Sequence, residues 1–164
     1  MKIAIISDTH DNLANIKKVI DWLDKEEIKI LLHCGDVATQ ETLKEGFKDF
    51  KGEIHISLGN ADIRYNLEPG KYGNRNVLSG FGEINLDKKR IAFVHFPEEA
   101  KDLAGKNKYN LVFYGHTHKP WEEKIGNCKL VNPGEAAGQF YKPTFAVYDT
   151  LSDKLELKII ERLV

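Results

Sequence analysis

Cysteine and long apolar runs are the two features that this chain has least of. Only two cysteines, Cys34 and Cys128, occur in 164 residues, and they lack the paired spacing of zinc or redox sites. We therefore expect free, buried thiols and no disulfide framework. The apolar run that follows Met1 is far too short for a membrane span or a secretory signal. These absences predict a soluble, cytoplasmic protein.

An excess of charge of one sign is also missing. The chain has 24 basic and 25 acidic residues, which leaves a formal net charge of −1. Long-range attraction to a nucleic-acid backbone or an anionic membrane is therefore not an organising feature, and we expect no membrane partner and no extended nucleic-acid surface. Any phosphate bound here needs a local cation. No Gly-rich Walker loop is present, so the use of nucleoside triphosphates is not indicated.

The first third of the chain alternates short apolar runs with amphipathic segments. Residues 2–7, 28–32 and 53–57 read as buried strands, because they carry β-branched residues and no helical period. Between them we predict two helices, capped by Asn12 and Thr39. The predicted apolar stripes of these helices are Leu13, Ile16, Ile20 and Leu23, then Leu43, Phe47 and Phe50. This β-α-β-α-β order predicts parallel strands, whose carboxyl ends collect ligands.

The remainder of the chain indicates a second layer of strands. Residues 63–76 show little period and predict a surface loop near the site. Residues 81–86 and 90–95 then flank a hairpin break, so a more antiparallel layer is expected to begin there. A short helix over 97–106, a strand over 111–114 and hairpins over 121–131 and 144–160 follow. We predict one α/β domain over residues 1–164, built as a sandwich of two sheets flanked by helices.

Metal-ligating side chains follow many of these predicted strands. The seven candidates are Asp8, His10, Asp36, Asn60, His95, His116 and His118. His116 and His118 point the same way if Thr117 lies between them in an extended segment. Seven ligands are too many for one ion, whereas two ions about 3.5–4 Å apart need one shared carboxylate and a few ligands each. We expect Asp36 to be that shared carboxylate.

The choice of metal stays open at this level. Carboxylate, amide and imidazole ligands without thiolate suit Mn, Fe, Zn, Ni or Co. Manganese is the ion that we expect at both positions, and the other four metals are its alternatives.

Five short motifs in a fixed order resemble those of the calcineurin-like metallophosphoesterases. They are Asp8-Thr9-His10, Gly35-Asp36, Gly59-Asn60, a later His95, and Gly115-His116-Thr117-His118. The small size and Asn132-Pro133-Gly134 resemble the compact bacterial and archaeal phosphodiesterase branch, which is related to the retromer scaffold subunit. The resemblance covers most of the chain and implies that family's four-layer αββα fold.

The resemblance also implies an activity and a division of the ligands. One ion would take Asp8, His10, Asp36 and His118, and the other Asp36, Asn60, His95 and His116. A hydroxide bridging the ions would attack phosphorus, with Asp36, Asn60 and His116 as the residues closest to the chemistry. The expected substrate is a small phosphoester, with nucleotide-derived diesters among the candidates.

This chain departs from the family pattern at two positions. Ala61 stands where many larger members carry a histidine that is thought to help the leaving group, so that role is unfilled. Phe96-Pro97 follows His95, where close relatives show Gly-His. Near the motifs, Asp62 could orient a ligand and Arg64 could hold a phosphate oxygen, although ordinary loop roles suit both. His33 and His55 have no partner in the pattern, and we leave them outside the site.

Other functions of the same fold are the alternatives to catalysis. A scaffold would keep the fold and bind partners through an apolar surface, and a regulatory sensor would bind a nucleotide without hydrolysing it. Metal content and turnover would separate these readings. The exposed aromatics Phe140 and Tyr141 could form a homodimer face, and the sequence does not decide the oligomeric state.

Overall fold

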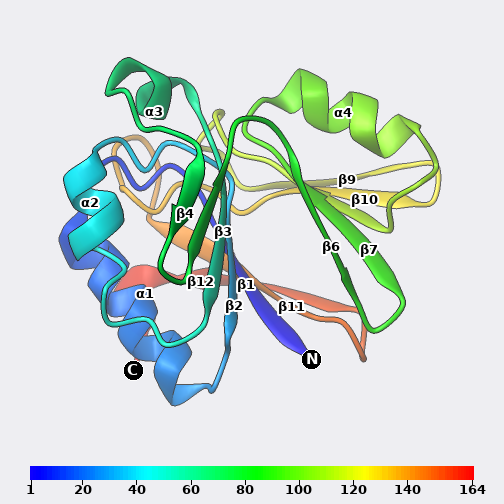
Figure 1. Cartoon of the computed structure of the whole chain (residues 1–164). Coiled ribbons are helices and arrows are strands. Elements are labelled where there is room, and N and C mark those ends of the chain that lie inside the picture. The colour runs from blue at the N-terminus through cyan, green and yellow to red at the C-terminus, as the bar shows by residue number, and fades with distance from the viewer.

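The apolar runs fold as strands of two packed sheets, and the amphipathic segments cover the outer faces of those sheets (Figure 1). The computed structural model describes every residue from Met1 to Val164. The helices are α1 (Leu13–Lys25), α2 (Gln40–Glu45), α3 (Asn60–Arg64), α4 (Pro97–Gly105) and a 3-10 turn over Ile160–Arg162. No helix combines the length and apolar character needed to cross a bilayer.

The larger sheet has seven strands in the order β12-β11-β1-β2-β3-β5-β4, and the smaller has five in the order β6-β7-β8-β10-β9. The strands of the larger sheet are β1 (Lys2–Ile6), β2 (Ile30–His33), β3 (Glu53–Ser57), β4 (Gly70–Tyr72), β5 (Arg75–Leu78), β11 (Thr144–Asp149) and β12 (Lys154–Ile159). Those of the smaller sheet are β6 (Gly82–Leu86), β7 (Lys89–Phe93), β8 (Leu111–Phe113), β9 (Trp121–Ile125) and β10 (Cys128–Asn132). The predicted sandwich of two sheets flanked by helices is confirmed.

Three apolar cores join the four layers. Successive side chains of a strand face opposite ways, so Ala4 and Ile6 of β1 pack toward α1 and α2, while Ile3 and Ile5 pack against the second sheet. A third core lies between the smaller sheet and α4, where Leu103 is buried. Each fully buried aliphatic side chain stabilises the fold by roughly 1.5–3 kcal/mol relative to exposure. The sheets are therefore held face to face.

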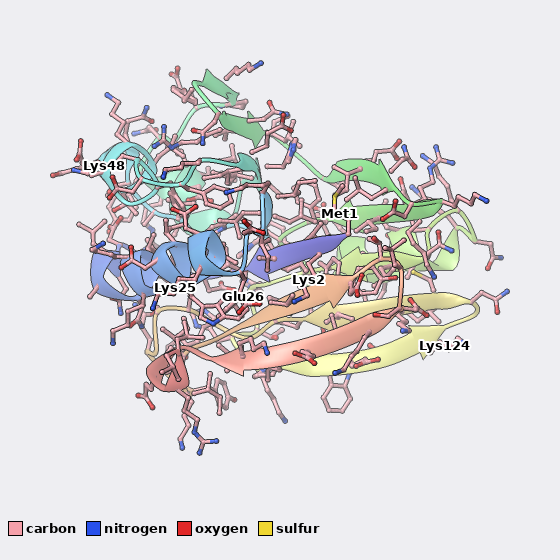
Figure 2. All side chains as sticks on the ribbon, turned by 90° about the horizontal axis from the view of Figure 1, so that it is seen from below. Met1, Lys2, Lys25, Glu26, Lys48 and Lys124 are labelled. Carbon is pink, nitrogen blue, oxygen red and sulfur yellow. The ribbon has the colours of Figure 1, made fainter.

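Helix α1 begins where its cap predicts. Asn12 accepts a hydrogen bond from Asn15 N at 3.0 Å, and residues Ile16, Ile20 and Leu23 are buried. Leu13 was expected in the same stripe but is 44% exposed, because it stands at the open first turn. At the other end of the helix, Glu26 Oε2 lies 3.4 Å from Lys2 Nζ of β1 (Figure 2).

Two expectations about local structure are wrong. Helix α2 ends at Glu45, so Phe47 and Phe50 reach the core from the turn that follows the helix. The stretch 63–76 is not simply a loop: it holds the end of α3, the strand β4 and the start of β5. β5 pairs in parallel with β3 and extends the sheet. Only Val77 of β5 is buried, which explains why the apolar pattern did not reveal the strand.

Strand direction places the site. β1, β2 and β3 run parallel in one sheet, and β7 and β8 run parallel in the other. The segments that follow these five strands carry all seven candidate ligands, with Asn60 as the first residue of α3. Hydrogen bonds link the loops, from Asp8 N to Gly35 O and from Gly115 N to His95 O, each at 3.0 Å. Parts of the chain that are far apart in sequence thus meet at one end of the sandwich.

Candidate metal centre

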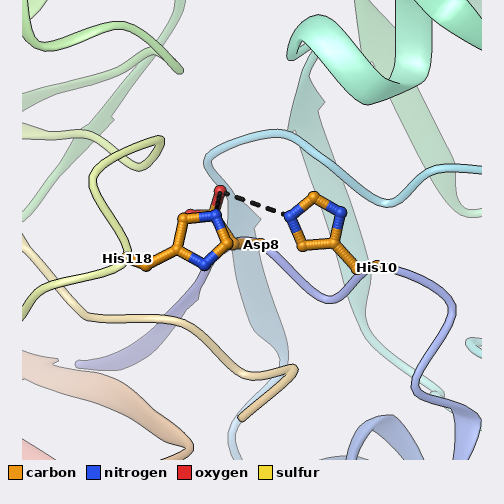
Figure 3. Close-up of side chains that lie close together, drawn as sticks. All are labelled: Asp8, His10 and His118. Atoms are coloured by element: carbon orange, nitrogen blue, oxygen red, sulfur yellow. Dashed lines mark ion pairs between the residues drawn. The ribbon is translucent and has the colours of Figure 1, made fainter. Parts of the chain in front are cut away.

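The first half of the site is built around Asp8. Its Oδ1 lies 3.4 Å from His118 Nε2 and 3.9 Å from His10 Nε2 (Figure 3). Asp8 is fully buried, and both of its carboxylate oxygens accept from His116 N, at 3.1 and 3.3 Å. His10 and His118 stack with ring centroids 5.2 Å apart. This half therefore consists of one buried carboxylate and two imidazoles.

The second half is built around Asn60. Its Oδ1 lies 3.1 Å from His95 Nε2 and 3.0 Å from His116 Nδ1, and those two ring nitrogens are 3.3 Å apart. His95 is fully buried, whereas His116 is exposed. The site therefore opens to solvent beside His116.

Asp36 stands between the two halves. Its Oδ2 is 3.6 Å from both His10 Nε2 and His95 Nε2. Its Oδ1 is already engaged, because it accepts from Ala61 N at 2.8 Å. One oxygen is thus fixed by the backbone and the other faces both sets of imidazoles. The structure brings all seven predicted side chains to one place.

The donor set fits a divalent metal. His10 Nε2 is buried and has no hydrogen-bond partner, although it faces two carboxylates. Acidic and imidazole side chains also converge closely enough to hold an ion in two groups, Asp8 with His10 and His118, and Asp8 with Asp36 and His95. A buried polar atom without a partner is costly in a folded protein. A cation would satisfy it.

The pKa values of the candidate ligands also favour a metal ion at this place. Burial raises the pKa of Asp8 well above its usual value, and Asp36 and Glu135 raise it further. Burial also lowers the pKa values of His10 and His95. These histidines are therefore neutral near pH 7, as metal ligands must be, and a divalent ion would offset the gathered negative charge.

The backbone around the ligands is strained. Asp8, His10, Asp36, His116 and His118 all have positive φ, between 39° and 67°. This left-handed conformation costs a non-glycine residue roughly 1–2 kcal/mol, and such strain gathers at functional sites. The expectation that His116 and His118 occupy an extended segment is wrong, because both are left-handed. The turns still aim the two rings into one cluster, one toward each half.

Glycine allows the ligand loops to approach one another. A Cβ on Gly115 would lie 2.7 Å from Asp8 Oδ2, and one on Gly35 would lie 2.6 Å from His95 Nδ1. Neither distance is tolerated by real side chains. The glycines that precede Asp36 and His116 in the sequence motifs are therefore needed because no larger residue fits there.

Two buried carboxylates support the ligands without facing the cluster directly. Asp62 accepts from Asp36 N, Ala38 N and Gly59 N, each at 2.8 Å, and so ties together the loops after β2 and β3. Burial raises its pKa to about 6. It contacts backbone amides and no histidine, so of the two expected roles the structure shows loop support.

The second supporting carboxylate, Glu135, is not among the candidates that the sequence predicts. Its Oε2 lies 3.0 Å from His118 Nδ1, and the side chain is fully buried. Burial alone would raise the pKa of Glu135, but hydrogen bonds from His118 and three backbone amides outweigh it and lower the pKa. A lone acid among the small residues Gly134, Ala136 and Ala137 was the available signal.

The two histidines left outside the site are indeed elsewhere. His33 Nε2 contacts Thr9 Oγ1 at 3.0 Å in the core, and His55 lies 3.6 Å from Glu53. Phe96, one of the departures from the family pattern, packs its ring against His95 and His116, with centroids 4.9 and 5.1 Å away. It forms an apolar wall beside the second half.

Comparison with known proteins gives consistent results. The model of the calcineurin-like phosphoesterase superfamily domain matches residues 1–153. Phosphodiesterase MJ0936 of Methanocaldococcus jannaschii is 33% identical over 156 residues, which cover 92% of this chain and 93% of the relative. Phosphodiesterase YfcE of Escherichia coli is 24% identical over 152 residues, covering 84% and 80%.

Solved structures agree with these relatives. A structure described as a novel archaeal phosphodiesterase superposes with a TM-score of 0.81 at 29% identity, covering 97% of this chain and 99% of the other. Vps29 of Chaetomium thermophilum superposes with a TM-score of 0.72 at 17% identity, covering 96% and 93%. The likeness to Vps29 concerns the fold alone.

Proposed function

The chain belongs to the calcineurin-like phosphoesterase superfamily, and on that premise we propose that it is a phosphodiesterase that uses two divalent metal ions. One observation carries the proposal. Asp36 Oδ2 lies at the same 3.6 Å from His10 Nε2 and from His95 Nε2. A single carboxylate oxygen placed between two imidazole sets is what a pair of ions sharing a ligand requires.

The ligands divide between the two halves of the site. Asp8, His10, Asp36 and His118 would hold one ion, and Asp36, Asn60, His95 and His116 the other. The unpartnered Nε2 of His10 supports the first assignment. The convergence of Asn60 Oδ1, His95 Nε2 and His116 Nδ1 within 3.3 Å supports the second.

When bound, two such ions would lower the pKa of a coordinated water molecule and offset negative charge on the phosphoryl oxygens. The residues of the chain orient and shape the site. Asp36 supplies the shared negative charge and is kept in place by Ala61 N. Asn60 and His116 stand at the solvent-exposed side of the cluster, where a phosphoryl group can enter.

The chain offers no side chain at Ala61 to protonate a leaving group. Ala61 is buried in the first turn of α3, and its methyl group carries no proton to donate. A poor alkoxide leaving group suffers more from that absence than an acidic one. The missing group therefore favours substrates with acidic leaving groups, and the phosphodiesterases that the chain resembles support the preference for diesters over monoesters that we propose.

The test compares matched substrates on metal-loaded protein. Protein stripped of metal and reloaded with Mn²⁺ should hydrolyse an aryl phosphodiester faster than the matched aryl monoester. His116→Ala should abolish turnover, while His55→Ala, which changes a histidine outside the site, should leave it unchanged. Faster monoester turnover would overturn the diester preference, and equal activity in the two variants would overturn the ligand assignment.

The same measurements separate catalysis from the alternatives. A scaffold predicts background hydrolysis with every metal offered. A nucleotide sensor predicts saturable binding of a nucleotide without turnover. Two ions per chain together with diester hydrolysis would exclude both.

Finer features belong to the same proposal. Nitrogen and oxygen ligands without thiolate suit manganese, the ion that we propose, as they also suit Fe, Zn, Ni and Co. The exposed ring of Phe140, with its centroid 5.0 Å from that of His118, supports a nucleotide-derived substrate, because aromatic rings stack on bases.

Tyr141, 46% exposed beside Phe140, supports a homodimer face. Unpaired, buried Cys34 and Cys128 suit a cytoplasmic location.

A further inference from the structure

Glu135 has the contacts of a positioning residue rather than of a spare acid in a turn. Its own backbone is anchored twice: its N–H donates to His118 O at 3.2 Å, and its carbonyl accepts from Thr144 N at 2.8 Å. The side chain is fully buried. Burying a carboxylate is expensive unless hydrogen bonds compensate it. The position of Glu135 is thus set by the fold, and its charge must be satisfied by nearby donors.

Four donors saturate the carboxylate. Oε1 accepts from Phe140 N and Tyr141 N, each at 2.6 Å. Oε2 accepts from Gln139 N at 2.8 Å and lies 3.0 Å from His118 Nδ1. An ionised carboxylate has about four lone-pair sites and no proton of its own to donate. The bond to His118 therefore requires the proton to sit on Nδ1 of the imidazole.

That proton decides what the other ring nitrogen can do. With Nδ1 protonated, a neutral imidazole would present a bare lone pair at Nε2, which lies 3.4 Å from Asp8 Oδ1. A bare Nε2 and a carboxylate oxygen that face each other at this distance need a proton or a metal ion between them. A carboxylate hydrogen-bonded to the far nitrogen is the usual way in which proteins orient a metal-binding histidine.

Glu135 also connects this histidine to a neighbouring loop. Its side chain holds the three consecutive amides of residues 139–141. The ring of Phe140, in the middle of this segment, packs edge-on against His118, with centroids 5.0 Å apart. One side chain thus fixes both the imidazole and the aromatic ring beside it.

We propose that Glu135 is a positioning residue that holds His118 with its proton on Nδ1 and its Nε2 aimed at the ion beside Asp8. The proposal rests on the proposed metal centre. It assigns to Glu135 a specific effect on one of the two ions, whereas a purely structural role would affect the loop and leave the imidazole tautomer unchanged.

The first test needs no metal. In the metal-free wild-type protein, imidazole ¹⁵N chemical shifts distinguish the two neutral tautomers of His118. The signal can be assigned by its loss in His118→Gln. We expect the form protonated on Nδ1. Observation of the form protonated on Nε2 would overturn the proposal, whether or not the protein binds metal.

The second test changes the charge and keeps the shape. In Glu135→Gln the side-chain amide must donate with one of its ends, so it competes with the amides of residues 139–141 and favours the opposite tautomer of His118. We expect Mn²⁺ affinity at one of two sites to fall about 10- to 100-fold, with the other site changed little. Titration calorimetry and metal counting would measure both.

The matched control is Glu122→Gln, an exposed acid on β9, which should bind like wild type. Equal Mn²⁺ affinities in Glu135→Gln and wild type would overturn the proposal. Equal weakening at both sites would also overturn it, because it would show general damage. Failure of wild-type protein to bind any metal would refute the proposed function instead, and the tautomer of His118 would still decide the role of Glu135.

Discussion

The two halves of the site use different means to orient their histidines. In the half that contains Asp8, His118 is backed by the charged Glu135, and His10 Nε2 has no partner at all. In the half that contains Asn60, His95 Nδ1 donates to the neutral carbonyl of Cys34 at 2.8 Å. Both arrangements leave a ring nitrogen bare toward the centre. The two halves differ in the charge of their side chains and in their exposure to solvent.

That difference suggests an order of metal binding. The half around Asp8 has its own buried carboxylate in addition to the shared Asp36, whereas the half around Asn60 adds only a neutral amide. The half around Asn60 also contains His116, whose side chain is exposed to solvent. Charge attraction in a buried site is strong because solvent screens it little. We therefore expect the ion beside Asp8 to bind first and more tightly.

The largest effect should come from removing the ligand that the halves share. In Asp36→Asn, the amide oxygen can still accept from Ala61 N, but the charge between His10 and His95 is lost. We expect both ions to bind at least ~100-fold more weakly, since even outer partners of ligands contribute ~10- to 100-fold. Diester turnover should fall to background. Metal counting after dialysis measures the first effect, and retention of one tight ion would contradict the shared role.

Removing one ligand from each half should separate the two ions. His10→Ala should eliminate the first, tighter binding step for Mn²⁺, and His95→Ala should eliminate the second. The reason is that each imidazole serves only one ion in the proposed arrangement. Calorimetric titration of the two variants side by side gives the answer. Loss of the same step in both variants would show that the halves are not independent.

Much of the fold follows from local sequence, and the exceptions have physical reasons. The strands at residues 2–6 and 53–57 carry buried, β-branched isoleucines, and helix α1 has a capping residue and an apolar stripe. The strands β4 and β5 lack such signals, because only Val77 among their seven residues is buried. β5 forms by pairing with β3, and β4 by pairing with β5, because tertiary context overrides propensity in strands of this kind.

The candidate site divides in the same way. The meeting of Asp8, Asp36 and Asn60 at one sheet edge follows from parallel strands that end in polar residues. The orientation of each imidazole does not, because it depends on Cys34 O for His95 and on Glu135 for His118. These partners are 61 and 17 residues away in sequence. Contacts at that range leave no periodicity in the sequence, and an acid flanked by small residues was the one local signal for Glu135.

A packing change can disturb the Asp8 half without replacing a ligand. In Gly115→Ala, the new Cβ would collide with Ser7 Oγ and would lie 2.7 Å from Asp8 Oδ2. We expect a loss of about 1–3 kcal/mol in the free energy of unfolding, together with weaker binding of the first ion. Urea unfolding of metal-free protein measures the stability. The control is Gly105→Ala in α4, where a Cβ meets open space; a similar loss there would contradict the clash.

The smallest expected effect is on the pH dependence of stability, and it comes from the buried residue His33 behind the Asp8 half. His33 is fully buried, accepts from Gly35 N at 3.1 Å and contacts Thr9, which lies between Asp8 and His10. Burial lowers its pKa to about 3, whereas an unfolded histidine titrates near ~6.5. Between these values the unfolded chain binds the proton that the folded chain refuses. Stability from this residue is therefore complete above about pH 6.5 and is lost as the pH falls toward 3.

For His33 alone, this difference amounts to about 1 kcal/mol of unfolding free energy between pH 6 and pH 5. In His33→Gln the titrating group is absent, while an amide can still bond to Thr9. The variant should therefore show a shallower fall in stability than wild type over that interval. Urea unfolding in the presence of a chelator isolates the effect from metal binding. Parallel pH profiles for the two proteins would mean that His33 does not carry the difference, and that other buried groups account for the acid sensitivity.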